Sequence, residues 1–161
     1  MQELTHEYLL NKLNYNPETG VFAWNISHNG TIVGKPVGSD RGNGYLAIRL
    51  LNKTYLLHRL AWFYVYAKWP DKCIDHIDNN RKNNRISNLR DVDRTVNNQN
   101  YRNAQANSKT GVLGVRKCKD RFHANIGVNS KSIFLGSFPT LEQASEAYRL
   151  GKEKYHVGAV K

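Results

Sequence analysis

The chain has 161 residues and carries 24 Lys and Arg against 13 Asp and Glu, which gives a formal net charge of +11. This length allows one domain or two small ones, and the charge favours a polyanionic partner such as a nucleic acid. No apolar run approaches the roughly 18 residues of a membrane span, and no charged segment followed by an apolar run opens the chain. We therefore expect no membrane anchor, no conventional export and a cytoplasmic location.

The positive charge is unevenly distributed along the chain. Residues 1–57 contain five Lys or Arg against four Asp or Glu, residues 58–107 contain nine against five, and residues 108–161 contain ten against four. The middle and C-terminal parts are therefore the ones expected to meet a polyanion, although a solvated Lys-rich surface is the alternative explanation.

The N-terminal part is expected to form a small scaffold of short elements. A helix should follow Thr5, and a turn should lead into a strand at 21–24. Alternating apolar residues in 45–57 predict a β-hairpin, and the aromatic-rich segment 58–69, stopped by Pro70, predicts a buried helix. Its aromatic side chains could stack on bases, but their number favours core positions.

The segment 74–100 carries the residues that point to chemistry. It begins with the pair Asp75-His76, continues through Asn-rich loops and ends with Asn97 in a predicted short helix. Hydrolysis of a phosphodiester requires a base that takes a proton from water. It also requires a hard divalent cation, held by oxygen ligands, that neutralises charge on the phosphate. His76 suits the first task, and Asp75 with Asn97 suits the second. Neighbouring side chains on a regular strand point to opposite faces. Asp75 and His76 can therefore serve one site only where the strand ends or twists.

These residues resemble the motif of the HNH endonucleases, which are built on a ββα-metal unit. The similarity comprises Asp75-His76 on the first strand, Asn88 in NNRISNLR before the second strand, and Asn97 on the helix, where Asn stands in place of His. The resemblance implies that His76 is the general base and that Asn88 belongs to the catalytic set by bracing the loop. It also implies that Asp75 and Asn97 hold the metal. An amide oxygen suits a hard ion, so we expect Mg²⁺ or Mn²⁺.

Several basic side chains accompany this motif. Arg85, Arg90 and Arg94 lie within it and are predicted to contact the DNA backbone. His58 and Arg59 lie at the start of the predicted aromatic helix, whose positive end could help to bind a phosphate. A structural hydrogen-bonding role is the alternative for these last two residues.

After the polar stretch 102–110, which we expect to be a linker, the pattern becomes one of strands followed by a helix. Three short strands are predicted at 112–117, 121–128 and 132–135. Thr140 and the Gln three residues later form a predicted capping box, which starts an amphipathic helix. The expected module is a three-stranded antiparallel sheet packed on one helix.

This module resembles the APETALA-type DNA-binding domain of plant ethylene-response factors. The segments that carry the similarity are Gly114-Val115-Arg116, the strand from Arg121 to Ile126, Leu135-Gly136-Ser137-Phe138, and the helix 142–148 with its pair of Ala residues. In that family the sheet enters the major groove of DNA, where each base pair presents a distinct pattern. The side chains predicted to contact DNA there are Arg116, Lys117, Lys119, Arg121, His123 and Lys131.

Together these features predict an α+β protein with an HNH endonuclease domain at 1–101, a linker at 102–110 and an APETALA-type domain at 111–161. The ββα-metal core is expected at about 58–101, behind an N-terminal β-rich scaffold. The two resemblances together imply a homing-type, site-specific DNA endonuclease of a bacteriophage or mobile element, and we expect it to leave a 5′ phosphate and a 3′ hydroxyl. One metal site per chain favours a monomeric nickase, and no protein partner is implied. Two alternatives stay open: a non-catalytic DNA-binding regulator with an HNH frame, and a nuclease that acts on RNA.

Overall fold

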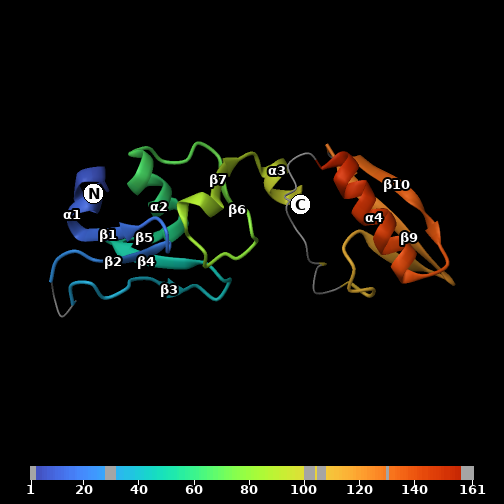
Figure 1. Ribbon diagram of the computed structural model, residues 1–161, viewed down its shortest axis with the longest axis horizontal. Coiled ribbons are helices and arrows are strands. Elements are labelled where there is room, and N and C mark those ends of the chain that lie inside the picture. Colours follow the sequence, from blue (N-terminus) through green and yellow to red (C-terminus); the bar gives the residue numbers. More distant parts are fainter. Residues whose placement is uncertain (1–2, 28–31, 100–103, 105–107, 130, 157–161) are drawn as a thin grey trace. The chain divides into compact units, whose positions relative to one another are not determined.

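The computed structural model describes residues 3–27, 32–99, 104, 108–129 and 131–156. Contacts divide the chain into two compact units, Met1–Asp93 and Arg94–Lys161 (Figure 1). Short helices alternate with four small sheets, and every strand pair of the described residues is antiparallel. The expected mixture of helices and antiparallel sheets is therefore confirmed. None of the described helices has the length and hydropathy needed to cross a membrane. Most of the linker expected at 102–110 lies outside the described residues.

The first unit begins with a helix and a hairpin. The helix α1 (His6–Lys12) is capped by Thr5, whose hydroxyl accepts a hydrogen bond from the backbone amide of Tyr8. The strands β1 (Leu13–Asn16) and β2 (Val21–Trp24) then pair with each other. The predicted helix after Thr5 and the predicted strand at 21–24 are both confirmed.

A second sheet and the aromatic-rich helix complete the scaffold of the first unit. The strands β3 (Ser39–Asp40), β4 (Leu46–Leu50) and β5 (Lys53–Leu56) lie side by side in that order. The helix α2 (Leu57–Tyr66) follows β5 directly. It ends at Tyr66 and not at Pro70 as predicted, because the next residue, Ala67, has the left-handed backbone conformation common after helices. The hairpin and the helix predicted for this part of the chain are both present.

The aromatic side chains of α2 belong mainly to the hydrophobic core. Phe63 is buried and stacks on Trp69 with ring centroids 4.3 Å apart, and Trp62 and Tyr64 pack against the same core. Tyr66 differs, because it is 52% exposed. The core interpretation therefore holds for three of the four aromatic residues of this helix.

The strand that ends with Asp75-His76 and the strand that begins at Leu89 form a separate two-stranded sheet. They are β6 (Cys73–His76) and β7 (Leu89–Val92), and a polar loop and the 3₁₀ turn η1 (Ile86–Asn88) connect them. The helix α3 (Arg94–Gln99) comes next in the chain and opens the second unit. The predicted order of two strands and a helix is thus present.

The rest of the second unit is a sheet with a helix on one face. The strands β8 (Val115–Cys118), β9 (Arg121–Val128) and β10 (Lys131–Phe138) lie in the order β10-β9-β8. The helix α4 (Leu141–Tyr155) packs against them (Figure 1). The hydroxyl of Thr140 accepts a hydrogen bond from the backbone amide three residues later, as the predicted cap requires.

Two strands of this sheet have bounds that differ from the prediction, β8 at its start and β10 at its end. The strand β8 begins later than predicted because Gly114 has a positive φ of 72° and lies against Tyr148, where a Cβ would come within 2.0 Å of the ring. The strand β10 continues past Leu135, because a register shift next to Gly136 lets its pairing with β9 resume. A turn and a bulge, both made possible by glycine, are the physical reasons for these differences.

Candidate active site

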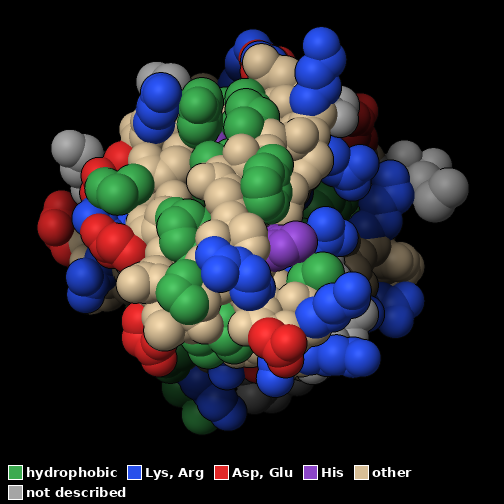
Figure 2. Space-filling model, turned by 90° about the vertical axis from the view of Figure 1, so that its right-hand side faces the viewer, with side chains coloured by type: hydrophobic (Ala, Val, Ile, Leu, Met, Phe, Trp, Pro, Cys, Tyr) green, Lys and Arg blue, Asp and Glu red, His purple; other side chains and the backbone are tan. Residues whose placement is uncertain are grey.

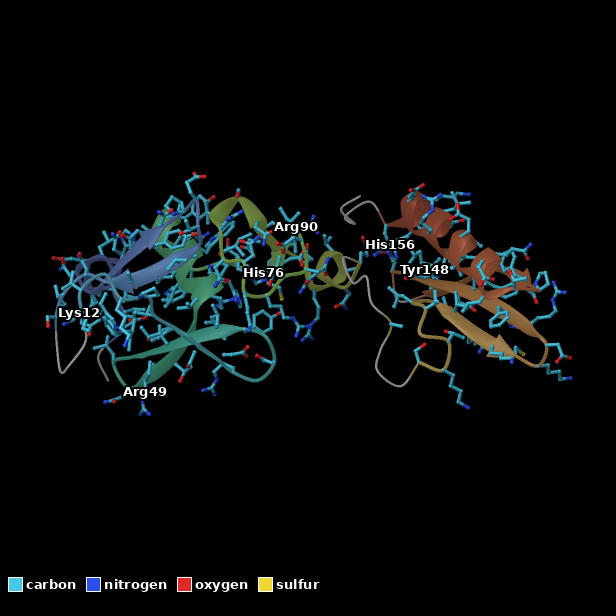
Figure 3. The ribbon with its side chains drawn as sticks, turned by 60° about the horizontal axis from the view of Figure 1, so that its bottom comes forward. Lys12, Arg49, His76, Arg90, Tyr148 and His156 are labelled. Carbon is cyan, nitrogen blue, oxygen red and sulfur yellow. The ribbon has the colours of Figure 1, made fainter. Side chains whose placement is uncertain are left out.

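Asp75 and His76 are the last two residues of β6. Asp75 lies opposite Arg90 of β7, and His76 lies opposite Leu89. His76 and Arg90, which belong to these two strands, are labelled in Figure 3. Neighbouring side chains of a strand leave from opposite faces, but the chain turns immediately after His76. Both residues are paired in the regular register of β6 and β7, and the strand ends only after His76. A common site for the two side chains therefore stays a prediction.

Asp75 is held in a buried ion pair. Its Oδ2 accepts a hydrogen bond from Nε of Arg90 at 2.8 Å and lies 2.7 Å from Nη2 of the same guanidinium. The two side chains are 6% and 24% exposed, respectively. A buried carboxylate needs such a partner because an unpaired buried charge is costly. Arg90, which the sequence predicts to contact DNA, thus bonds Asp75, and its contact with DNA stays a prediction.

The imidazole of His76 is enclosed by groups from three other segments. Its Nε2 lies 3.2 Å from Oδ1 of Asn84, and its ring centroid lies 5.2 Å from that of His58 and 6.0 Å from that of Tyr45. Burial lowers the pKa of His76 below its ordinary value of 6.5, although the bond with Asn84 and nearby carboxylates act in the opposite direction. The imidazole is therefore neutral at pH 7, the form that accepts a proton.

His58 belongs to this buried cluster rather than to the surface. The residue is 5% exposed, and burial, together with the neighbouring His76 and Arg59, lowers the pKa of His58 to about 3. A buried neutral imidazole offers no positive charge to a phosphate, which favours the structural alternative for His58. Arg59 is half-buried, and its phosphate contact stays a prediction.

Asn88 ties together the loop that follows β6. Its Oδ1 accepts a hydrogen bond from the backbone amide of Asp78, and its Nδ2 donates to Oδ1 of Asp78 and to the carbonyl oxygen of Asn83. The backbone amide of Ile77 donates to the carbonyl oxygen of Asn88 at 2.9 Å. Burial opposes ionisation of Asp78, yet bonds from Asn83, the Asn80 amide and Asn88 hold the pKa of Asp78 below its ordinary value. These are the contacts of a loop-bracing residue, and the catalytic contribution of Asn88 stays a prediction.

The predicted metal ligands are Asp75 and Asn97. Asn97 lies on α3 and is half-buried. Within the part of the chain that the structure describes, no group of three or more His, Cys, Asp or Glu side chains could hold a metal ion. One carboxylate and one amide oxygen instead fit a hard ion such as Mg²⁺, which binds through few protein ligands and keeps several waters. The two residue types suit the expected ion, but Asp75 and Asn97 belong to different units, so their pairing as ligands stays a prediction.

The other basic residues near the motif differ in what they contact. Arg85 and Arg94 are exposed, as a contact with the DNA backbone would require. Arg81 donates to the carbonyl oxygen of Asn43 at 2.8 Å and lies over the ring of Tyr45. Arg81 thus ties the polar loop to the segment of Asn43 and Tyr45, while the DNA contacts of Arg85 and Arg94 stay predictions.

Three of the predicted DNA-binding residues share one face of the C-terminal sheet. Arg116 lies opposite His123, and Arg121 belongs to the same face by strand alternation. Arg121 donates to the hydroxyl and the carbonyl oxygen of Ser137 at 2.9 and 2.8 Å. The ring of His123 lies 5.5 Å from that of Phe134, which is 56% exposed. This face, turned away from α4, presents cationic and aromatic side chains together.

The three predicted lysine contacts lie elsewhere on the same sheet. Lys117 is paired with the core residue Phe122, so strand alternation directs it towards the α4 face at the edge strand β8. Lys119 lies in the β8–β9 turn with a positive φ of 52°, and Lys131 begins β10; all three are exposed. Figure 2 shows Lys and Arg side chains scattered over one face of the molecule, among hydrophobic and other side chains. A single flat contact therefore does not bring all six predicted residues together.

A comparison with protein families adds an independent finding. Residues 55–99 match the sequence model of the HNH endonuclease family, and this segment includes Asp75, His76, Asn88 and Asn97. HNH nucleases act on DNA and generally use a divalent metal ion, so the match supports a nuclease of this class with a DNA substrate. Neither the comparison with curated proteins nor the comparison with solved structures gave a match.

Several residues around His76 were not predicted from the sequence. Asn84 contacts His76, Tyr45 lies against its ring, and Tyr15 bonds the backbone of Asn84. Asn84 lies eight residues after His76 in a loop rich in Asn, where nothing in the sequence distinguishes it from its neighbours. Tyr15 lies in a different hairpin, so only the fold shows that it reaches this loop.

Proposed function

We propose that the protein is a site-specific, homing-type DNA endonuclease of a bacteriophage or mobile element. It hydrolyses one phosphodiester of double-stranded DNA and leaves a 5′ phosphate and a 3′ hydroxyl. The observation that carries the proposal is the neutral, enclosed imidazole of His76 at the end of β6, inside the segment that matches HNH endonucleases.

In this proposal His76 is the general base. Because burial holds its pKa below the ordinary value, the imidazole is unprotonated at neutral pH and can take a proton from the attacking water. Asp75 and Asn97 would hold one Mg²⁺ or Mn²⁺, which when bound supplies positive charge to the phosphate and the leaving oxygen. Asn88 keeps the loop after β6 in one conformation through its bonds to Asp78 and Asn83.

The C-terminal sheet is the proposed DNA-reading element, used in the manner of an APETALA-type domain. Arg116, Arg121 and His123 lie on one exposed face, where they can reach base edges in the major groove. Lys117, Lys119 and Lys131 are exposed around it and suit phosphate contacts, which position a protein on DNA without reading sequence. One proposed metal site per chain suits a monomer that nicks one strand.

The test is a cleavage assay that works for any target sequence. A supercoiled plasmid pool with random inserts is incubated with the full chain and Mg²⁺, and run-off sequencing locates the cut ends. We expect nicks at a shared sequence, with loss of cutting in the variant His76→Ala. Binding with a steep salt dependence but no cleavage, even with Mn²⁺, would instead identify a non-catalytic DNA-binding regulator. Preferred cleavage of RNA would identify the other alternative.

A further inference from the structure

The β1–β2 hairpin lies outside the segment that matches HNH endonucleases, yet it contacts the loop that carries Asn84. The hydroxyl of Tyr15 donates to the carbonyl oxygen of Asn84 at 2.7 Å, and Tyr15 is 5% exposed. Gly20, in the hairpin turn, leaves room for the same backbone. A Cβ there would lie 2.5 Å from the carbonyl carbon of Asn84 and 2.4 Å from the amide nitrogen of Arg85. Two separate contacts of the hairpin therefore fix the backbone at Asn84.

The side chain of Asn84 connects this fixed backbone to His76. Its Oδ1 lies 3.2 Å from Nε2 of His76, and Asn84 and His76 are 1% and 4% exposed. Among the described residues, Nδ2 of Asn84 has no hydrogen-bond partner. A buried amide that served packing alone would be expected to satisfy both of its polar groups. Within the described part of the chain, the side chain of Asn84 uses only its Oδ1, in the bond to the imidazole of His76, and this indicates a role directed at His76.

We propose that the β1–β2 hairpin and Asn84 form a positioning device for His76. Tyr15 and Gly20 hold the backbone of Asn84, and Oδ1 of Asn84 accepts the Nε2–H of His76. A neutral imidazole with its proton on Nε2 carries its lone pair on Nδ1, so the bond to Asn84 favours the tautomer in which Nδ1 can accept a proton. The importance of this tautomer for catalysis rests on the proposed function. The tautomer itself is inferred from the contact between His76 and Asn84 alone.

The hairpin fixes Asn84 more firmly than a surface loop could. The ring of Tyr15 lies 4.6 Å from that of Phe22 and 5.6 Å from that of Tyr64, so the hydroxyl is carried on a ring locked in the aromatic core. Burial raises the pKa of Tyr15 to about 12, which keeps the hydroxyl protonated and able to donate. The scaffold thereby reaches the imidazole through two hydrogen bonds, from Tyr15 to Asn84 and from His76 to Asn84.

The test reads the protonated nitrogen of His76 directly. The full chain, with ¹⁵N-labelled histidine, is studied by ¹⁵N–¹H correlation NMR at pH 8, and the His76 signals are assigned by their loss in His76→Gln. We expect the Nε2–H pattern in the wild type and in Asn84→Asp, which keeps an acceptor oxygen. We expect a mixture of tautomers in Asn84→Ala, a weaker preference for Nε2–H in Tyr15→Phe, and no change in Asn14→Ala, a control on an exposed residue of the same strand.

The same variants are compared in the cleavage assay. Asn84→Ala should lower kcat about 10- to 100-fold, as the loss of an orienting partner of a site residue commonly does, with KM for DNA unchanged. A wild-type spectrum with the proton on Nδ1, or a tautomer that does not respond to Asn84→Ala, would overturn the proposal even if the protein cuts DNA. If Asn84→Ala does not fold, the spectrum of Tyr15→Phe decides in the same way. The expected spectra without any cleavage would support the positioning device and refute the nuclease instead.

Discussion

The nuclease motif and the C-terminal sheet present their histidines in opposite ways. His76 is 4% exposed, bonded to Asn84 and packed against His58, whereas His123 is half-buried on an open face beside the exposed Phe134. A buried polar group is costly unless its partners are fixed, so enclosure brings rigidity. An exposed side chain is solvated and can adjust to a ligand. Proton transfer needs the first property and contact with DNA needs the second, so the two regions suit different tasks.

The strongest test of this difference between the two regions replaces one histidine in each of them by alanine. Loss of a general base typically costs a factor of about 10² to 10⁴ in rate, so His76→Ala should nearly abolish cleavage while DNA affinity stays close to that of the wild type. His123→Ala should do the reverse, with weaker binding and an unchanged rate at saturating DNA. Single-turnover cleavage and gel-shift titrations on the same DNA measure both quantities. Equal effects of the two variants on the cleavage rate would contradict the assignment of proton transfer to one region and DNA contact to the other.

A second test compares two ion pairs, one in each region. Arg90→Ala leaves the carboxylate of Asp75 buried without its guanidinium, and breaking such a buried pair costs about 3 kcal/mol or more of unfolding free energy. Arg149→Ala breaks bonds to Glu146 and Glu153 on the exposed face of α4, where solvent screens the charges, so little change is expected. Urea unfolding followed by circular dichroism compares the variants. A stable Arg90→Ala protein would show that the pair with Asp75 is dispensable.

Local sequence signals predict elements of the fold in both regions. The helix cap at Thr140, the strand at 121–128 and the hairpin before α2 follow from local signals, and the structure contains all three. Local signals miss what long-range contacts decide, such as the late start of β8, where Gly114 lies against Tyr148. Periodicity predicts elements well and predicts their ends less well.

The candidate site shows the same limit more strongly. Asp75, His76 and Asn88 stand out because their residue types and spacing match a motif, and the structure places them around one short strand pair and its loop. The enclosure of His76 by His58 and its bond to Asn84 depend on a packed tertiary structure. No spacing rule predicts that a neutral imidazole from α2 will lie against the proposed base.

The open face of the sheet can be tested through its salt dependence. Removing one cation that contacts a phosphate should weaken binding by about tenfold and lower the slope of log K against log salt by about 1. Lys119→Ala, in the β8–β9 turn, should show this change equally for all DNA sequences. Arg116→Ala should instead relax the preference at one base pair, because its side chain lies on the proposed reading face. Arg149→Ala, on α4, is the control in the same fluorescence-anisotropy titrations.

The last prediction concerns the response of the buried imidazole of His58 to acid. The pKa of His58 falls from 6.5 to about 3 on folding, so between these values the unfolded chain binds a proton that the folded protein excludes. The corresponding stability is present above pH 6.5 and is lost as the pH falls, by up to about 1.4 kcal/mol per pH unit. His58→Gln removes this titration, so its unfolding free energy should change less steeply between about pH 6.5 and 4.5, whatever its value at about pH 8. Urea titrations at several pH values measure the slope. An unchanged slope would mean that His58 is accessible to protons in the folded state, and the enclosure of His76 would then be looser than its contacts indicate.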